Sequence, residues 1–308
     1  MKNILIYTHM PEFNFTDGGT VVQYELAKIL EKYGQTVRIF LSGNIQIENL
    51  IFSKYYDENE FPIDDNTVVV YCEGTIGNPL NAKYVVRWML SKLGQNVPYS
   101  HLNTWSKNEL VYYFLSEEKI ANNPDKIGNI YKLLNVLYIH PYATNYNLNP
   151  RSETCYTIRK AVNIHGKVPN FVHPPNSFEI TKTHTQLECI KIFNNHKYFI
   201  SYDSLTFLSI IAALCGCISI VKKVEGLSKQ EWLNTTAAAE YLNETNEGLL
   251  YGVAYGADDL DYAINTLHMA KDQWRRIQQF SKEKYVTRFI DDINNWDSMV
   301  NTINTNFF

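Results

Sequence analysis

The first half of the chain alternates short apolar runs with longer segments in which apolar residues recur every three to four positions. The predicted strands are residues 4–8, 36–41, 67–71, 110–115 and 135–139, and the predicted helices are residues 20–33 and 81–92. The run at 67–71 is the clearest strand. Gly34 is placed to end the first helix. Strands that alternate with helices predict a parallel sheet covered on both faces.

The same pattern starts again in the second half. Strands are predicted at residues 154–158, 198–202 and 218–221, a short strand or a turn at 252–255, and helices at 183–194, at 205–214 and from 258 onward. The loop at 140–151, rich in Asn, Pro and Tyr, separates the halves. We therefore predict two α/β domains, 1–145 and 146–285. Residues 286–308 are predicted to form a C-terminal helix.

Composition narrows the class of protein. The 308 residues carry 28 Lys and Arg against 32 Asp and Glu, a net charge of -4, which argues against a nucleic-acid partner. No apolar run reaches the ~18–20 residues that span a bilayer, and no signal peptide is recognisable. The 5 Cys are odd in number and not paired in spacing, which favours a reducing compartment. A cytoplasmic location is expected, and the oligomeric state stays open.

Polar residues follow several predicted strands of the first half. Gly18 and Gly19 lie between strand 4–8 and the first helix, where backbone N–H groups suit a phosphate. The alternative is a plain turn with Thr20 as the N-cap. Glu73 and Asn78 follow strand 67–71, where they are placed to bind sugar hydroxyls, with Glu73 as a candidate general base. The alternative is a tight loop capped by an asparagine.

Two groups follow strands of the second half. Arg159 and Lys160 end strand 154–158, where two cations suit a diphosphate, or else form a solvated surface pair. The second group, after strand 198–202, consists of Tyr202, Asp203, Ser204 and Thr206. Its hydroxyls suit a phosphate and its carboxylate suits a sugar or ribose hydroxyl. The alternative is that these residues only cap the next helix.

No metal site is predicted. Asp259 and Asp261 match a D-x-D metal pattern, but they follow Gly256 and open a helix, so we interpret them as capping residues. The 8 His include no H-E-x-x-H motif.

Three segments resemble the GT-B glycosyltransferases, in particular the large retaining group called family four and the glycan-synthesising transferases of bacteria and large DNA viruses. Residues 17–37 resemble the family's Gly-Gly loop, helix and strand entry, and residues 77–88 resemble a loop and helix of polysaccharide-type transferases. Residues 212–221, Ala-Ala-Leu-Cys-Gly-Cys-Ile-Ser-Ile-Val, are similar to the family's "E-A-M-A-C-G-x-P-V-I" segment. Of the two family Glu positions, the first is Asp203 and the second is Ile211.

The resemblance implies two Rossmann-like domains that face a central cleft, with the C-terminal helix crossing back to the first domain. It implies transfer of a hexosyl or pentosyl group from a nucleoside-diphosphate sugar, the co-substrate, to a glycan acceptor, as in polysaccharide biosynthesis, without a metal or another cofactor. Asp203 and Glu73 are the expected catalytic residues, and Glu73 and Asn78 are expected to contact the acceptor. The expected donor-binding residues are Gly18, Gly19, Arg159, Lys160, Tyr202, Ser204 and Thr206.

Two other interpretations remain open. One is a nucleotide-sugar epimerase or hydrolase, and the other is a non-catalytic glycan-binding or scaffolding relative. The loss of the second acid at Ile211 favours the non-catalytic relative. The donor base, the donor sugar, the acceptor and the retaining or inverting outcome stay open.

Overall fold

The chain forms two compact units. The computed structural model describes residues 2–8, 17–41, 54–94, 96–115, 129–147, 150–159, 161–162, 170–204 and 206–298. Unit 1 comprises Met1–Tyr138 and Phe280–Phe308, and unit 2 comprises Ile139–Gln279. The sequence places the two boundaries slightly later, after residues 145 and 285.

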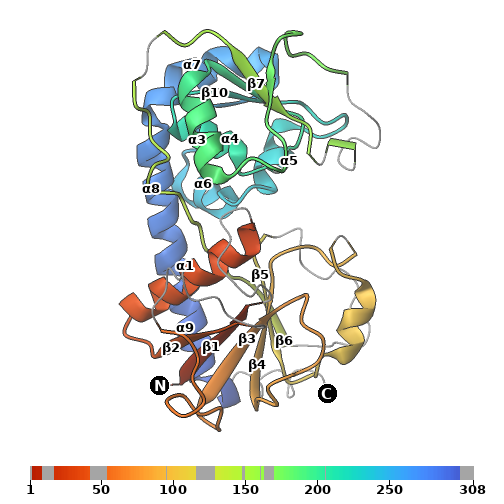
Figure 1. Cartoon of the computed structure of the whole chain (residues 1–308), viewed down its shortest axis with the longest axis vertical. Coiled ribbons are helices and arrows are strands. Elements are labelled where there is room, and N and C mark those ends of the chain that lie inside the picture. Colours follow the sequence, from red (N-terminus) through yellow and green to blue (C-terminus); the bar gives the residue numbers. More distant parts are fainter. Residues whose placement is uncertain are drawn as a thin grey trace. The chain divides into compact units, whose positions relative to one another are not determined.

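Unit 1 contains a six-stranded, all-parallel sheet (Figure 1). Its order is β2-β1-β3-β4-β5-β6. The elements are β1 (Asn3–Thr8), α1 (Gly18–Lys32), β2 (Val37–Leu41), β3 (Thr67–Cys72), β4 (Tyr84–Met89), η2 (Tyr99–Thr104), β5 (Leu110–Tyr113) and β6 (Asn129–Leu133). A π-helical turn (Lys282–Val286) and α9 (Thr287–Asn294) complete the unit.

The strands of unit 1 are apolar on both sides because each face of the sheet is covered. Ile4 and Ile6 belong to a core with α1 and α9, whereas Leu5 between them packs in a second core. Successive side chains of a strand point to opposite faces, so a continuous apolar run supplies both cores. In the described part of unit 1, loop residues such as Phe61 and Ala82 pack against strand residues in the second core.

The C-terminal segment returns to unit 1. Phe289 and Ile293 of α9 are fully buried in the core that also holds Ile4. Asp292 of α9 accepts a hydrogen bond from the Tyr112 hydroxyl of β5 at 2.7 Å and forms an ion pair with Lys132 of β6 at 2.8 Å. Burial and the Asp292 carboxylate raise the pKa of Tyr112 well above its usual value, so Tyr112 stays a donor.

Unit 2 contains a five-stranded, all-parallel sheet in the order β11-β10-β9-β7-β8. Its strands are β7 (Thr154–Thr157), β8 (Phe178–Glu179), β9 (Tyr198–Ser201), β10 (Ile218–Val221) and β11 (Val253–Tyr255). Its helices are α3 (Gln186–Asn195), α4 (Leu208–Leu214), α5 (Lys229–Asn234), α6 (Ala239–Thr245), α7 (Leu260–Thr266) and α8 (Ala270–Ser281), with short 3-10 turns at Ala257–Asp259 and Leu267–Met269. The predicted α/β class, with two parallel sheets and helices, is confirmed.

Two predicted elements of the first half are wrong. Residues 81–92 contain strand β4 instead of a helix, and β6 lies at Asn129–Leu133 instead of 135–139. The apolar spacing of 81–92 fits a helix, but Val85, Val86 and Trp88 favour a strand, and β4 pairs with β3 and β5. Asn81, with φ of 49°, ends the preceding turn in a left-handed conformation that a helix start does not use.

Two predictions from composition can be compared with the described residues. All 5 Cys are buried and free, as small apolar core residues. Within those residues, no helix combines the length and the apolar character needed to cross a bilayer.

Candidate functional site

Each sheet has a point at which the strand order reverses. In unit 2, the chain leaves β7 toward β8 on one side and later adds β9 on the other side of β7. In unit 1, the corresponding point lies between β1 and β3. Connections from neighbouring strands diverge there, which leaves a crevice beyond the carboxyl ends, where open α/β sheets bind ligands. Most of the predicted site residues follow β7, β9 or β3.

The switch point of unit 2 brings Arg159 and Asp203 to one edge. Thr157 of β7 is the register partner of Ser201 of β9, and Arg159 and Asp203 each follow two residues later. The Arg159 guanidinium donates from Nη2 to the Thr181 carbonyl at 2.9 Å, and its buried Nε has no hydrogen-bond partner in the described part of the chain. An unsatisfied guanidinium N–H favours an anion at this edge.

Asp203 is held in place by its backbone. Its N–H donates to the Ser201 hydroxyl at 3.2 Å, and that hydroxyl donates to the Asp203 carbonyl at 2.6 Å. The residue is buried, with 3% of its surface exposed. A carboxylate in a fixed backbone conformation at a strand end is suited to orient a ligand hydroxyl.

Tyr202 anchors a neighbouring segment instead of facing solvent. Its hydroxyl oxygen accepts the N–H groups of Val172 at 2.6 Å and His173 at 3.3 Å, and it lies 3.0 Å from His173 Nδ1. Burial lowers the pKa of His173, and the neutral ring accepts the Tyr202 proton at Nδ1. The His173 ring stacks on Tyr156 with centroids 3.7 Å apart, so Tyr202 fixes an aromatic group beside the switch point.

Ser204 and Thr206 contact other residues of unit 2. The Ser204 carbonyl accepts the Trp232 indole N–H at 2.9 Å, and the Thr206 hydroxyl accepts the Leu208 N–H at 3.3 Å at the start of α4. Lys160 lies outside the described residues. Ile211, where the resemblance expects an acid, is buried in the apolar α4.

Gly18 and Gly19 form the first turn of α1 instead of a separate loop. Asp17 is the N-cap, and its carboxylate accepts the Thr20 N–H at 2.8 Å. Thr20 is therefore a helical residue and not the N-cap. Among the described residues, no atom lies within 4 Å of the position that a Cβ at Gly18 would occupy.

The edge of unit 1 after β3 is a tight, hydrogen-bonded turn. Both carboxylate oxygens of Glu73 accept hydrogen bonds, from the Leu90 N–H at 2.8 Å and from the Ser91 hydroxyl at 2.6 Å. Asn78 binds both main-chain groups of Ala82, at 3.1 and 2.8 Å, and accepts from the Tyr71 hydroxyl at 3.0 Å. Both predicted side chains thus shape the loop that they belong to.

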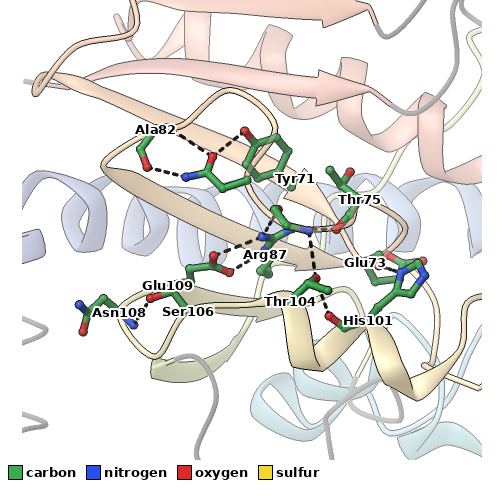
Figure 2. A network of polar contacts seen from close by, with 12 residues as sticks. Tyr71, Glu73, Thr75, Ala82, Arg87, His101, Thr104, Ser106, Asn108 and Glu109 are labelled. Carbon is green, nitrogen blue, oxygen red and sulfur yellow. Dashed lines mark hydrogen bonds and ion pairs between the residues drawn. The ribbon is translucent and has the colours of Figure 1, made fainter.

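Sequence reasoning missed the centre of this network, the pair Arg87–Glu109 (Figure 2). Arg87 of β4 is fully buried and contacts both oxygens of Glu109, at 2.6 and 3.2 Å. It also donates to the carbonyls of Thr75 at 3.0 Å and Gly77 at 2.5 Å. The missed signal was a cation inside an apolar β run, which needs a buried partner. Glu109, just before β5, supplies that partner.

The aromatic surroundings of Arg87 complete the network. Its guanidinium carbon lies 5.0 Å from the ring centre of Tyr71 and 5.1 Å from that of Trp105. Such contacts favour a buried cation. Burial raises the pKa of Tyr71 to about 12, so its hydroxyl remains protonated and donates to Asn78. The loop after β3 is therefore fixed by the hydrogen bonds of Arg87 to its carbonyls and by the Tyr71–Asn78 hydrogen bond.

Possible metal ligands are not grouped in the described ranges. Within them, no set of three or more His, Cys, Asp or Glu lies close enough to hold an ion. Asp259 accepts the Tyr255 N–H at 3.2 Å and pairs with Lys229 at 2.5 Å, and it makes no side-chain cap hydrogen bond. The Asp259 carboxylate therefore binds the Lys229 ammonium and the main-chain N–H of Tyr255 in β11, and it does not cap α7 through a side-chain hydrogen bond. Activity without a metal stays a prediction.

Comparisons with known proteins give distant similarities of structure only. No protein-family model matches the chain, and no curated protein is significantly similar in sequence. A β-glucosyltransferase described as a DNA modifying enzyme, solved with and without uridine diphosphoglucose, has a TM-score of 0.46 and 10% identity, over 97% of this chain and 98% of the other. An α-glucosyltransferase in complex with UDP and a 13-mer DNA has a TM-score of 0.46 and 11% identity, over 92% and 94%.

A third structure, a glycosyltransferase from Rickettsia africae ESF-5, has a TM-score of 0.45 and 13% identity, over 97% of this chain and 99% of the other. The descriptions of the first two structures name DNA. The expectations of a glycan acceptor and of no nucleic-acid partner for this chain stay predictions. The described structure itself establishes the two parallel α/β sheets.

Proposed function

We propose that the protein is a glycosyltransferase that binds a nucleoside-diphosphate sugar at the switch point of unit 2 and transfers the sugar to a hydroxyl acceptor. The observation that carries the proposal is the placement of Arg159 and Asp203 at one sheet edge, each two residues beyond paired strand ends. A cation suits the diphosphate and a carboxylate suits a sugar hydroxyl. Lys160, Ser204 and Thr206 belong to the same proposed donor site. In unit 1, Gly18 and Gly19 stay predicted donor contacts, and Glu73 and Asn78 stay predicted acceptor contacts.

Arg159 is proposed to stabilise the leaving diphosphate. As the bond between the anomeric carbon and the phosphate oxygen breaks, negative charge develops on that oxygen. A guanidinium that is fixed by the Thr181 carbonyl meets this charge without reorganising. Asp203, held by Ser201, orients the donor sugar for attack.

The acceptor class is the less constrained part of the proposal. A glycan is the acceptor that the sequence resemblance implies. DNA with an HMU base, named for the α-glucosyltransferase above, is included as a second probe. Hexosyl and pentosyl donors are tested together because no described contact distinguishes them.

Turnover tests the proposal. Purified protein is incubated with UDP-, GDP-, dTDP-, CMP- and ADP-sugars, with and without Mg²⁺, and with oligosaccharides or HMU-containing duplex DNA. Released nucleotide and glycosylated product are measured by chromatography and mass spectrometry. Arg159→Gln and Asp203→Asn are each expected to lower kcat/KM by about 100-fold or more, as loss of a transition-state contact does. Arg275→Gln, an exposed arginine of the same unit, serves as the matched control.

The products separate the alternatives. A glycosylated acceptor supports a transferase, whereas an isomerised nucleotide sugar or free sugar alone identifies an epimerase or a hydrolase. Full activity of Arg159→Gln and Asp203→Asn would contradict the assignment of these two residues to the donor site. If the wild-type protein binds and converts none of the donors, a non-catalytic relative replaces the proposal, in agreement with the apolar Ile211.

A further inference from the structure

Unit 2 contains a hollow of about 230 Å³ at the edge of its sheet opposite to the proposed donor site. All the residues that line it belong to unit 2, and they come from the segment 139–143, the end of α4 and α8. Because α4 runs from the carboxyl end of β9 to the amino end of the parallel strand β10, its last residue, Leu214, lies at the amino ends of the strands. A single water needs roughly 10–15 Å³ of such space, so the hollow has room for a ligand of several atoms.

The walls of the hollow are fixed within unit 2. Asn194 of α3 is buried, and its side-chain amide donates to the Thr144 carbonyl at 3.0 Å while its oxygen accepts the Tyr146 N–H at 2.8 Å. These bonds hold the segment that follows the unit boundary. On the other side, α8 is anchored by the fully buried Trp274. A hollow whose walls are already ordered costs little conformational entropy when a ligand enters it.

Lys271 gives the hollow a positive charge that no acid of the described residues neutralises. Its ammonium donates to the Thr144 hydroxyl at 2.8 Å, and no described Asp or Glu forms an ion pair with it. An ammonium has three N–H donors, so two remain for an anion. Arg275, one turn further along α8, is already paired with Asp272 at 3.3 Å, and 66% of its side chain is exposed. Arg275 therefore lies at the rim.

The rest of the lining suits an uncharged, apolar part of a ligand. Its apolar members are Ile139, Pro141, Ala143 and Leu214. His140, which also lines the hollow, is 5% exposed, and burial lowers its pKa, so the ring is neutral at pH 7. Its Nδ1 accepts the Tyr142 N–H at 3.2 Å, which places the proton of the neutral ring on Nε2. The histidine thus adds a flat ring and no second charge.

We propose that this hollow is a second ligand site, which binds a small organic anion. The carboxylate or phosphate of the ligand contacts the Lys271 ammonium, and its apolar body packs on the four apolar residues. A mostly apolar hollow with a few fixed polar groups is the usual form of a small-molecule site. The site lies at the opposite sheet edge from Arg159 and Asp203, so it is independent of the proposed transferase function.

The first test titrates the full-length protein with benzoate and phenyl phosphate, which carry the two kinds of anionic group on the same ring. Benzamide, the neutral analogue, and inorganic phosphate, which lacks the ring, are the matched probes, and ligand-observed NMR spectroscopy measures binding. At least one of the two organic anions is expected to bind with a Kd of about 1 mM or tighter. The tighter of the two identifies the anionic group. Benzamide and inorganic phosphate are expected to bind at least about 10-fold more weakly, because each lacks one part of the interaction.

Two variants assign the binding to the hollow. Lys271→Gln is expected to weaken it by about 10- to 100-fold, as loss of a charged hydrogen bond does, and Ala143→Leu is expected to abolish it by filling the space. Lys191→Gln, an exposed lysine of α3, is the matched control and is expected to keep the wild-type affinity.

Three results would overturn the inference: no binding of either organic anion, equal binding of benzamide, or full affinity in Lys271→Gln. Arg159→Gln separates the two sites of unit 2. It is expected to keep the affinity for the organic anion. Binding of phenyl phosphate that Arg159→Gln loses and Lys271→Gln retains would assign the anion to the donor site, which overturns the second site and leaves the proposed function standing.

Discussion

At the scale of single residues, buried polar side chains in unit 1 act mainly on the loop after β3. Arg87, Glu73 and Asn78 each bind main-chain groups of neighbouring turns. The sequence indicated Glu73 and Asn78 because they follow a clear strand, but it did not show that their side chains are already hydrogen-bonded. That information depends on Leu90, Ser91 and Ala82, whose contacts form only when the loop closes.

The first prediction concerns the buried ion pair. Arg87→Met leaves the Glu109 carboxylate buried without its partner, so the free energy of unfolding is expected to fall by about 3–5 kcal/mol. Urea unfolding measures the change. The double variant Arg87→Met/Glu109→Leu is expected to recover part of the loss because no uncompensated charge remains. A single variant as stable as the wild type would contradict the buried pair.

The second prediction concerns pH. Burial lowers the pKa of His140 and of His173 in the folded state, whereas unfolded histidine titrates near ~6.5. Between the lowered folded pKa and ~6.5 the unfolded chain binds more protons, so stability is complete above ~6.5 and is lost as pH falls through this window. The free energy of unfolding is therefore expected to be lower at pH 5.5 than at pH 7.5.

His140→Asn tests the source of that pH dependence. Asparagine retains an acceptor for the Tyr142 N–H, which His140 Nδ1 accepts at 3.2 Å. The variant is expected to show a smaller difference between pH 5.5 and 7.5, whereas His268→Asn keeps the wild-type difference. Hydrogen bonds lower the pKa of Glu188 and Glu231 as well, but these carboxylates lose their contribution only at more acidic pH.

At the scale of elements, the sequence predicted strands best where an apolar run is short and bounded by polar residues. The runs that became β3 and β10 were placed within one residue of their ends. The segment at 81–92 failed because its apolar spacing fits a helix as well as a strand. Pairing with β3 and β5, a contact between distant residues, decides between them.

The third prediction concerns a helix start. Thr185 and Glu188 form a capping box on α3, with the Thr185 hydroxyl accepting the Glu188 N–H at 3.2 Å and the Glu188 carboxylate accepting the Thr185 N–H at 2.7 Å. Thr185→Ala is expected to lower the free energy of unfolding by about 1 kcal/mol, and Thr185→Ser is expected to retain it. Denaturant unfolding of the two variants compares them. Equal losses would show that the cap hydroxyl contributes nothing.

At the scale of the whole molecule, each unit offers a switch point, and α9 belongs to the first unit. Tandem repeats of strand and helix predicted two sheets, whereas the return of the C-terminal helix was expected only from the resemblance. The order of strands, and therefore the switch points, could not be predicted because order depends on which distant strands pair. The proposed donor site depends on that order, since it brings Arg159 and Asp203 to one edge.

The fourth prediction concerns the return of the C-terminus. Asp292→Ala removes the acceptor of the Tyr112 hydroxyl and the partner of Lys132, so unit 1 is expected to lose about 2 kcal/mol of stability. Hydrogen exchange is expected to rise in α9, β5 and β6 and to stay unchanged in β9 and β10 of unit 2. Asp291→Ala, an exposed neighbour, is the control. Faster exchange in both units to the same degree would contradict a local role.

The central claim is that the edge of unit 2 with Arg159 and Asp203 binds a nucleoside diphosphate, and thermal unfolding with UDP, GDP, dTDP, CDP and ADP tests it most directly. At least one of them is expected to raise the melting temperature, by an amount that corresponds to about 2.7 kcal/mol at 100 times its Kd. The shift is expected to disappear in Arg159→Gln and to persist in Arg275→Gln. No shift with any nucleotide, or a shift that Arg159→Gln retains in full, would contradict the claim.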